Sequence, residues 1–443
     1  MKSILDLTAA QQGRAIEQGQ LDPVALTQAY LDAAEDHTET QRIFTMLTPE
    51  RALAEARAAQ TRARSGQRLS PLDGVPISWK DLFDTAGYTT EAGSALLRGR
   101  TPERDAKVLH NASTMGLVCI GKTHMSELAF SGLGLNPVTE SPPCVNDPSA
   151  VSGGSSSGAA ASVAFGLAAA AIGSDTGGSV RIPAAWNDLV GLKTTAGVLP
   201  MDGVVPLCEH FDTIGPLSKT VEDAALLFAA LQGRPALDMQ SCDLRGKRLA
   251  VLQTAAFDDL RDAPGIGFET AVARLAKAGA VIKNIEIPAV SEALPLSPIL
   301  YTSEAYGTWK DVIEAKPDLM FDEILKRFRG GAEFTASDYV ATWRKLGGLR
   351  QSYAEKSAGY DAVLCPSAPI LPPDAQRLLS DDSYYVTENL LALRNTRIGN
   401  LMGLCAVTLP TGTPSCGLML MASPGEENRL LRLSAAAETA FKS

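Results

Sequence analysis

Residues 152–195 carry the side chains best suited to chemistry, and that chemistry would be acyl transfer. Two clusters of glycine and serine, at residues 153–158 and 177–179, flank an uncharged, alanine-rich run at residues 159–173. Two consecutive glycines precede Ser179, so the backbone there can adopt positive φ and turn several N–H groups toward one point. A serine hydroxyl beside converging N–H donors supplies a nucleophile and a site for an oxyanion.

Each cluster alone is also typical of a glycine-rich turn without chemistry. Residues 154–158 fit the G-x-S-x-G pattern of the nucleophile elbow, which follows a hydrophobic strand and works with a histidine. Residues 148–151 (PSAV) predict a poor strand, and none of the four histidines, at positions 37, 110, 124 and 210, lies in a recognisable triad context. The sequence therefore does not favour the elbow.

The two clusters together resemble the amidase signature family. That family pairs a GGSSGG-like cluster with a later G-(S/T)-D-x-G-G-S-(I/V)-R-x-P-A. The corresponding segments here are GGSSSG at residues 153–158 and GSDTGGSVRIPA at residues 173–184. Ser155 and Ser179 are 24 positions apart, which is the separation in the family pattern.

The resemblance implies a serine–serine–lysine mechanism. Ser179 would be the nucleophile, Ser155, on a cis peptide bond, would relay a proton, and Lys80 would be the base and then the acid. Lys80 lies in residues 71–81 (PLDGVPISWKD), similar to the family's P-L-x-G-x-P-x-x-x-K-D. A lysine that closes a strand is otherwise usually solvated. Since only a neutral lysine is a base, and burial or nearby positive charge lowers its pKa, we expect Lys80 in a water-poor site beside Ser155.

The resemblance also implies an oxyanion hole and a supporting shell around Ser179. The expected oxyanion donors are the backbone N–H groups of Thr176, Gly177, Gly178 and Ser179, and the expected supporting residues are Asp175, Arg181 and Ser156. Asp175 and Arg181 flank the nucleophile, so they are expected to support the loop through an ion pair or through backbone hydrogen bonds. The family implies no metal and no organic cofactor.

Other matches run from about residue 71 to the C-terminus, with departures. The family usually has asparagine where this chain has His124, and proline where it has Thr194 and Cys405. A contact of His124 with substrate stays open, but a hydrogen-bonded structural histidine is favoured. Thr220 is expected to N-cap a helix, with Asp223 three positions on, in a structural block at residues 211–224. Residues 395–397 and 400–404 match the family's C-terminal pattern.

Composition excludes several classes of protein. The 443 residues are 45% hydrophobic and 20% charged, as in ordinary globular proteins. A net charge of −10 does not favour a nucleic-acid-binding surface. Seven scattered cysteines without a CxxC pattern are typical of a reducing compartment and give no zinc signature. With no signal-peptide pattern and no long apolar span, a cytoplasmic protein without membrane contacts is expected.

The order of predicted elements indicates an α/β fold. Helices are expected over residues 8–18, 23–34, 50–64, 105–115, 265–278, 337–357 and 426–441. Strands are expected over residues 75–79 and 361–365, both buried, and over residues 117–120, 248–253, 281–287, 406–409 and 417–421. Residues 158–173 predict a buried helix, turn and strand, and residues 141–148 an irregular loop. The alternation predicts a mixed sheet covered by helices on both faces.

The resemblance implies one large α/β domain over residues 1–443. Within it, residues 1–66 would form a helical segment packed on the body, which in the family often contributes to a lid or a dimer contact. Residues 71–224 would form the signature core that carries the catalytic residues. Pocket walls are expected from residues 301–357 and parts of residues 125–136.

Three functions remain open at this point. The first is an amidohydrolase that cleaves a small-molecule carboxamide, or a carbamoyl or urea-type amide, into a carboxylate and ammonia or an amine. The second is the amidase subunit of a tRNA-dependent amidotransferase, which supplies ammonia from glutamine in a complex. The third is a catalytically inactive binding protein. Departures at Ser157, His124 and Thr194, with the compact length, favour the first. The substrate and oligomeric state are not predicted, although a homodimer is common in the family.

Overall fold

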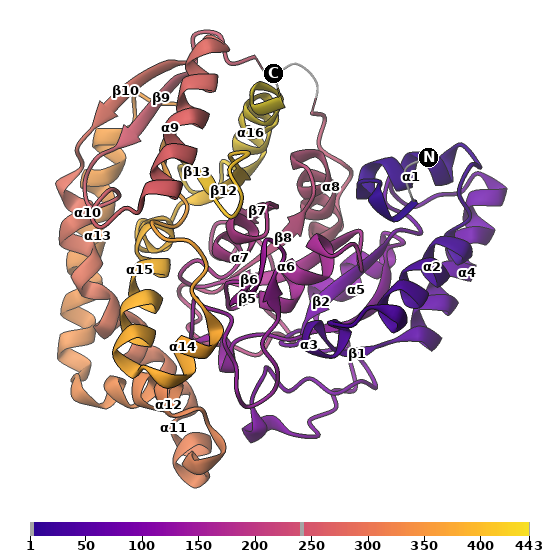
Figure 1. The fold of residues 1–443 in the computed structure, drawn as a ribbon, viewed down its shortest axis with the longest axis horizontal. Helices are drawn as coiled ribbons and strands as arrows, with labels where there is room; N and C mark the ends of the chain where they lie inside the picture. The colour runs from indigo at the N-terminus through magenta and orange to yellow at the C-terminus, as the bar shows by residue number, and fades with distance from the viewer. Residues whose placement is uncertain (1–3, 240–242, 443) are drawn as a thin grey trace.

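An eleven-stranded mixed sheet runs through the computed structural model, which describes residues 4–239 and 243–442 (Figure 1). The strand order is β1-β3-β2-β6-β8-β7-β12-β13-β11-β9-β10. These strands are β1 Phe44–Leu47, β2 Pro76–Lys80, β3 Val118–Thr123, β6 Ala170–Asp175, β7 Val190–Lys193, β8 Thr213–Ser218, β9 Arg248–Leu252, β10 Val281–Ile285, β11 Ala362–Pro366, β12 Cys405–Pro410 and β13 Gly417–Ala422.

The sheet joins strands from distant parts of the chain. β2 is parallel to β3 and β6, and β9 is parallel to β10 and β11, whereas the neighbours from β6 across to β11 are antiparallel. In the middle, β12 pairs with β7, with Val407 opposite Leu192. The β7–β12 pairing joins the N-terminal and C-terminal parts of the chain in one sheet. The chain therefore forms a single α/β domain with a mixed sheet, as the sequence predicts.

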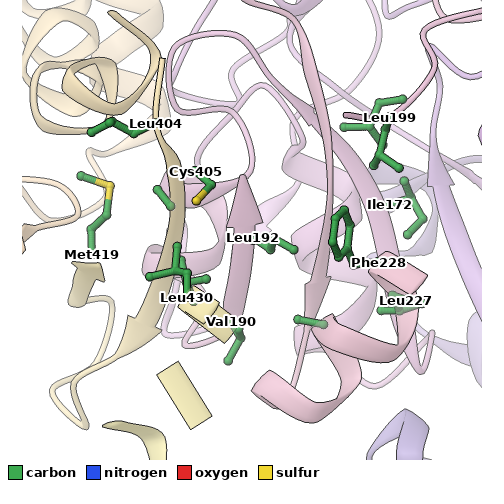
Figure 2. Packing of buried hydrophobic residues seen from close by; sticks show 14 of the residues in the cluster. Ile172, Val190, Leu192, Leu199, Leu227, Phe228, Leu404, Cys405, Met419 and Leu430 are labelled. Atoms are coloured by element: carbon green, nitrogen blue, oxygen red, sulfur yellow. The ribbon is translucent and has the colours of Figure 1, made fainter. Parts of the chain in front are cut away.

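Helices cover both faces of the sheet. The α-helices are α1 Ala9–Glu17, α2 Pro23–Asp36, α3 Thr40–Ile43, α4 Pro49–Ser65, α5 Lys107–Thr114, α6 Ser157–Ala164, α7 Arg181–Trp186, α8 Val221–Gln232, α9 Asp262–Lys277, α10 Pro288–Ala293, α11 Ser303–Ala315, α12 Asp322–Arg329, α13 Ala336–Ser357, α14 Ala375–Ser380, α15 Asp382–Leu401 and α16 Glu427–Lys442. Ala171 of β6 packs in the cluster formed with α6 and α7. The next residue, Ile172, joins the main core with Leu227 and Phe228 of α8 (Figure 2). Successive strand residues point to opposite faces, so both faces are buried.

The N-terminal helices lie at one end of the sheet (Figure 1). α2 and α4 pack on each other and on β3. The Asp22 carboxylate caps α2 by accepting hydrogen bonds from the N–H groups of Val24 and Ala25, at 2.9 and 3.1 Å. This packing supports our proposal that residues 1–66 are a helical segment on the body and that residues 71–224 are the core of the site.

Most predicted elements are present, and one prediction about a loop is wrong. α6 and β6 form the expected buried helix and strand, and Thr220 Oγ1 accepts the Asp223 N–H at the start of α8. Residues 141–148 are not irregular throughout, because β4 (Pro143–Cys144) and β5 (Asp147–Val151) form a small antiparallel sheet. Residues 148–151 are therefore a strand. The first three residues of β5, at positions 147–149, are exposed, so no apolar pattern reveals this strand.

No helix within residues 4–239 and 243–442 is both long enough and apolar enough to cross a membrane. The six cysteines in these ranges are buried and unpaired. The seventh, Cys242, lies outside the described residues.

Candidate active site

Lys80 ends the internal strand β2, which is fully buried between β3 and β6. Its Nζ donates hydrogen bonds to Ser155 Oγ at 2.7 Å and to Ser174 Oγ at 2.8 Å. Burial lowers the pKa of Lys80 to about 7, although the charges of Asp175 and Asp212 oppose this. The structure therefore confirms the expectation that Lys80 lies in a water-poor site beside Ser155. A lysine with this pKa is partly neutral near pH 7 and can accept a proton.

Ser155 lies on the loop before α6, after a cis Gly154–Ser155 peptide bond. Its carbonyl oxygen accepts the Ser126 N–H at 3.2 Å. The next residue, Ser156, donates its N–H to the carbonyl oxygen of Ser179 at 3.1 Å. The Ser156 Oγ accepts the Ser174 N–H at 3.3 Å and donates its own proton to the Ser174 carbonyl oxygen at 3.2 Å. These contacts fix the two serine loops to each other and to the end of β6.

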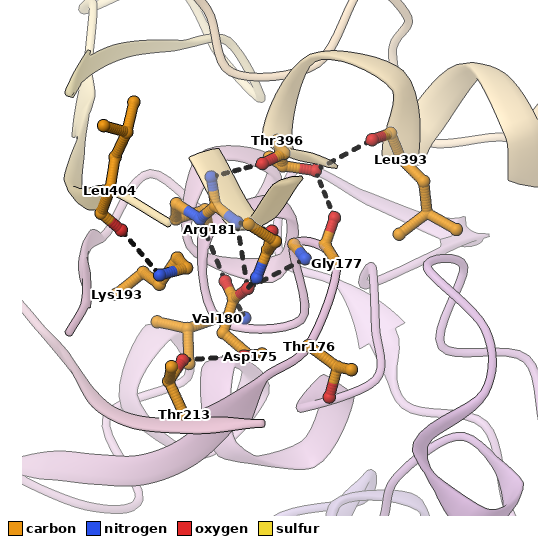
Figure 3. Close-up of polar contacts among 12 residues, drawn as sticks. Asp175, Thr176, Gly177, Val180, Arg181, Lys193, Thr213, Leu393, Thr396 and Leu404 are labelled. Atoms are coloured by element: carbon orange, nitrogen blue, oxygen red, sulfur yellow. Dashed lines mark hydrogen bonds and ion pairs between the residues drawn. The ribbon is translucent and has the colours of Figure 1, made fainter. Parts of the chain in front are cut away.

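The loop from β6 to α7 carries Ser179, and Asp175 organises it (Figure 3). The Asp175 carboxylate accepts the N–H groups of Gly178 at 2.9 Å and Val180 at 3.2 Å, and it pairs with the fully buried Arg181 at 2.9 Å. Burial alone would raise the pKa of Asp175, but the charge and hydrogen bonds of Arg181 hold it at about 2. The ion pair that the sequence allowed is thus present and fixes the loop.

Helix α15, from the C-terminal part of the chain, contacts the loop from the other side. Thr396 Oγ1 donates to the Gly177 carbonyl oxygen at 2.8 Å, and its own carbonyl oxygen accepts a hydrogen bond from Arg181 at 2.6 Å (Figure 3). The Asn400 side-chain oxygen accepts a hydrogen bond from Arg181, and its Nδ2 donates a hydrogen bond to the Asp175 carboxylate at 2.9 Å. The sequence matched residues 395–404 to the family pattern without assigning them a role. The structure shows that they anchor the nucleophile loop.

Not all the predicted oxyanion donors are free. The Gly178 N–H donates to Asp175, so it is already hydrogen-bonded. Within residues 4–239 and 243–442, the N–H groups of Thr176, Gly177 and Ser179 have no hydrogen-bond partner. They are therefore available to a bound oxygen atom.

Asp212 is a neighbour of the site that sequence reasoning missed, because it lies in a block interpreted as structural. It accepts hydrogen bonds from Thr176 Oγ1 and from the N–H groups of Leu207 and Cys208. Burial raises the pKa of Asp212 to about 6. The carboxylate fixes the Thr176 side chain at the start of the nucleophile loop.

Ser179 lines a narrow pocket that is partly open to solvent. The other residues of its wall are Ala129, Phe130, Ser131, Thr176, Gly177, Leu207, Tyr301, Arg327, Leu393 and Arg397. The first three lie in residues 125–136, and Tyr301 and Arg327 lie in residues 301–357, which confirms both expected wall segments. The contribution of α15, through Leu393 and Arg397, was not expected.

His124 is buried and acts through its backbone. Its carbonyl oxygen accepts the Gly158 N–H at 2.9 Å and the Ser157 hydroxyl at 3.3 Å. Burial lowers the pKa of its ring to about 4. Its burial favours the structural interpretation, although the ring Nδ1 has no hydrogen-bond partner among the described residues. Among the described residues, no group of three or more histidine, cysteine, aspartate or glutamate side chains is placed to hold a metal ion.

Comparison with known proteins gives matches over nearly the whole chain. The family model described as Amidase matches residues 25–431. A 2-amino-5-chloromuconic acid deaminase from Comamonas testosteroni is 35% identical, and the match covers 87% of this chain and 85% of the relative. A glutamyl-tRNA(Gln) amidotransferase subunit from Chloroflexus aggregans is 32% identical, with 96% and 95% covered.

Solved structures of amidases have the same fold as this chain. The native peptide amidase from Stenotrophomonas maltophilia has a TM-score of 0.82 to this chain at 27% identity, and the match covers 99% of this chain and 97% of that one. The protein therefore belongs to the amidase family of carbon–nitrogen hydrolases.

Proposed function

We propose that this protein hydrolyses the carboxamide of a small molecule through an acyl-enzyme on Ser179, with Ser155 and Lys80 as its proton relay. The observation that carries the proposal is the 2.7 Å hydrogen bond from Lys80 Nζ to Ser155 Oγ, buried beside the loop that holds Ser179. A lysine and a serine in this arrangement are a recognised alternative to a histidine base.

The first half of the reaction acylates Ser179. Its Oγ attacks the amide carbon while its proton passes to Ser155 Oγ, and the Ser155 proton passes to neutral Lys80. The carbonyl oxygen becomes an oxyanion, which the N–H groups of Thr176, Gly177 and Ser179 would bind. The absence of partners for these three N–H groups within residues 4–239 and 243–442 supports this assignment. One such donor contributes ~3 kcal/mol to transition-state stabilisation.

The second half breaks the C–N bond and releases the acid. Protonated Lys80 returns a proton through Ser155 to the leaving nitrogen, so ammonia or an amine departs and the acyl group stays on Ser179. A water molecule then attacks the acyl carbon and gives its proton to the same relay. The carboxylic acid leaves, and Ser179 regains its hydroxyl proton.

Ammonia release from simple amides, measured for the wild type and three variants, tests the mechanism. We expect Ser179→Ala, Ser155→Ala and Lys80→Met each to lower kcat by at least about 1000-fold, since members of such a unit act together. Ser157→Ala is the matched control. Ser157 is an equally buried neighbour whose hydroxyl donates only to the His124 carbonyl oxygen, so this variant should keep most activity.

Survival of activity in Ser179→Ala would contradict the mechanism. Labelling by a fluorophosphonate gives a second readout, because it needs only a reactive Ser179. Labelling that persists at the wild-type rate in Lys80→Met would show that Lys80 is not the base.

A role within an amidotransferase complex is the second candidate, because the Chloroflexus aggregans relative matches 96% of this chain. Hydrolysis of small amides by the purified chain without a partner would favour the stand-alone enzyme. The Comamonas relative, named 2-amino-5-chloromuconic acid deaminase, supports including acidic compounds among the substrates tested.

A homodimer and a cytoplasmic location stay predictions from the sequence. Sedimentation equilibrium of the purified chain would test the first, and fractionation of the source cells the second.

A further inference from the structure

The pocket beside Ser179 contains two arginines that no carboxylate neutralises. Arg327 comes from α12 and Arg397 from α15, and both line the pocket together with Ser179. Throughout residues 4–239 and 243–442, neither guanidinium forms an ion pair with an acidic side chain. The side chains beside them are phenols, which are neutral at working pH: those of Tyr301 and Tyr385 for Arg327 and that of Tyr301 for Arg397.

The hydrogen-bonding capacity of both guanidinium groups is largely unused. Arg327 donates one hydrogen bond, at 2.8 Å, to the Phe130 carbonyl oxygen and lies 4.4 Å from the centre of that ring. Arg397 lies 5.9 Å from the centre of the Tyr301 ring and, in the described part of the chain, donates no hydrogen bond. A guanidinium has five N–H donors, and because both side chains are half-buried, most of these donors are left for water or a ligand. Burial and the charge of Arg397 lower the pKa of Arg327 to about 10.

Tyr301 adds a third unused donor. Its hydroxyl is buried and has no hydrogen-bond partner among the described residues. Burial raises the pKa of this phenol, so it stays a neutral O–H donor at every working pH. In a chain with a net charge of −10, two cations and an unpaired hydroxyl on one small pocket are not explained by general basicity.

We infer that Arg327, Arg397 and Tyr301 bind a carboxylate of the substrate, so that the enzyme acts on short amides that carry a negative charge. Arginine binds carboxylates through two parallel N–H···O hydrogen bonds, and an anion would relieve the repulsion between the two cations. The proposal rests on the proposed hydrolysis at Ser179 and names its substrate class.

The other residues of the pocket wall restrict the linker between the carboxylate and the scissile amide of the substrate. Phe130, Leu207 and Leu393 are apolar and share the pocket with Ser179 and the arginines. The pocket is small, so the carboxylate and the scissile amide must be close together. The favoured substrate is therefore a half-amide of a short dicarboxylic acid, with a few apolar carbon atoms between the two groups.

Three pairs of probes test this inference. Malonamate, succinamate and glutaramate each carry one amide and one carboxylate, and their diamides are neutral and nearly the same size. We expect kcat/KM for the best half-amide to exceed that of its diamide by about 100-fold, as for loss of a charge-assisted pair. Equal or better hydrolysis of all three diamides would overturn the inference and leave the proposed function intact.

Variants of the arginines assign the effect to these side chains. Arg327→Met and Arg397→Met should each lower kcat/KM for the half-amide by about 100-fold and change that for the diamide by less than about threefold. Arg394→Met is the matched control. It lies one turn before Arg397 on α15, is also partly buried, and approaches Asp259 instead of the pocket. Equal losses on charged and neutral amides in the arginine variants would contradict the subsite.

Binding without turnover separates this inference from the proposed function. Calorimetry on Ser179→Ala should show the half-amide binding about 100-fold more tightly than the diamide, and Arg397→Met on that background should abolish the difference. If the wild type hydrolyses none of the six amides but this difference is present, the carboxylate subsite stands and the proposed function fails. If binding shows no preference for the anion, the subsite is refuted.

Discussion

Lys80 has to be buried to act as a base, and the burial that lowers its pKa also costs stability. With a pKa of about 7 in the folded protein, the neutral fraction rises as pH rises through 7. We therefore predict that kcat/KM increases with pH and reaches a plateau about one unit above this pKa. A pH–rate profile from pH 5.5 to 9 on one amide checks it. A profile that falls over this range would contradict the base role.

The same shift predicts how Lys80 affects folding. Its pKa is about 7 when folded and near 10.5 when unfolded, so between these values the unfolded chain binds a proton that the folded chain does not. The free energy of unfolding therefore rises with pH between 7 and 10.5. Below pH 7 the destabilisation caused by burying Lys80 has its full size. Lys80→Met removes the penalty. We expect inactive protein whose gain in free energy of unfolding over the wild type is larger at pH 6 than at pH 9, measured by urea unfolding.

Asp175 neutralises Arg181, and both side chains are fully buried. Asp175→Asn leaves that guanidinium without a charge partner and weakens the hydrogen bonds to the Gly178 and Val180 N–H groups. Breaking one side of a buried pair costs about 3–5 kcal/mol. We expect a loss of this size in thermal unfolding, together with loss of activity.

The exposed pair Arg329–Glu314 gives the control for this prediction, because both of its side chains are solvent-accessible. Glu314→Gln should change stability by less than about 1 kcal/mol. Equal effects of Asp175→Asn and Glu314→Gln would refute the loop-organising role of Asp175.

At the scale of elements, the nucleophile loop touches α15 so closely that only glycine fits at position 178. Gly178 has φ of +142°, and an added Cβ would lie 2.1 Å from Thr396 Oγ1. Gly178→Ala must therefore displace either the loop or α15, and with it the three free N–H groups. We predict at least about a 100-fold loss of kcat, the size of losing one oxyanion donor, together with a lower melting temperature.

Gly347→Ala is the matched control, because position 347 has room for a methyl group. Gly347 is exposed in the interior of α13, and nothing lies within 4 Å of an added Cβ. This variant should be active and more stable by about 0.5–1 kcal/mol. Wild-type activity of Gly178→Ala would show that the loop does not need this geometry.

The motif around Ser179 could be predicted from sequence because its contacts are local. Asp175 and Arg181 lie six positions apart and form the expected pair, and the run that contains Ser155 folds as the expected loop and helix. The N-terminal helices were also predictable, since their apolar spacing and the Asp22 cap are local signals.

Other elements lack such signals. β8 was not predicted because it contains Gly215 and Pro216, and proline disfavours a central strand. Pro216 is tolerated because the ladder from β7 reaches only Leu217 and Ser218. Residues that meet Ser179 from far along the chain were missed as well. Asp212 and Arg397 were not assigned to the site, and Arg327 lies in an expected wall segment but was not named itself. These residues reach the Ser179 loop or its pocket only through the tertiary fold, which their spacing in sequence does not reveal.

At the scale of the whole molecule, the catalytic loop depends on the C-terminal part of the chain. β7 and β12 are neighbours in the middle of the sheet, although more than 200 residues separate them. The buried Arg181 finds two of its partners, Thr396 and Asn400, on α15. A fragment that ends before β9 would leave one edge of β7 unpaired and would bury Arg181 with only Asp175 as partner.

We therefore predict that residues 1–239 do not form a working site alone, even though they contain Lys80, Ser155 and Ser179. Unpaired strand edges and an incompletely hydrogen-bonded guanidinium both destabilise a fold. Expressed alone, the fragment should be insoluble or show no fluorophosphonate labelling. Co-expression with residues 240–443 should restore labelling, because the second fragment supplies β12 and α15. Labelling of the lone fragment at the wild-type rate would mean that the loop holds its shape without α15, and the long-range anchoring by Thr396 and Asn400 would then not be required.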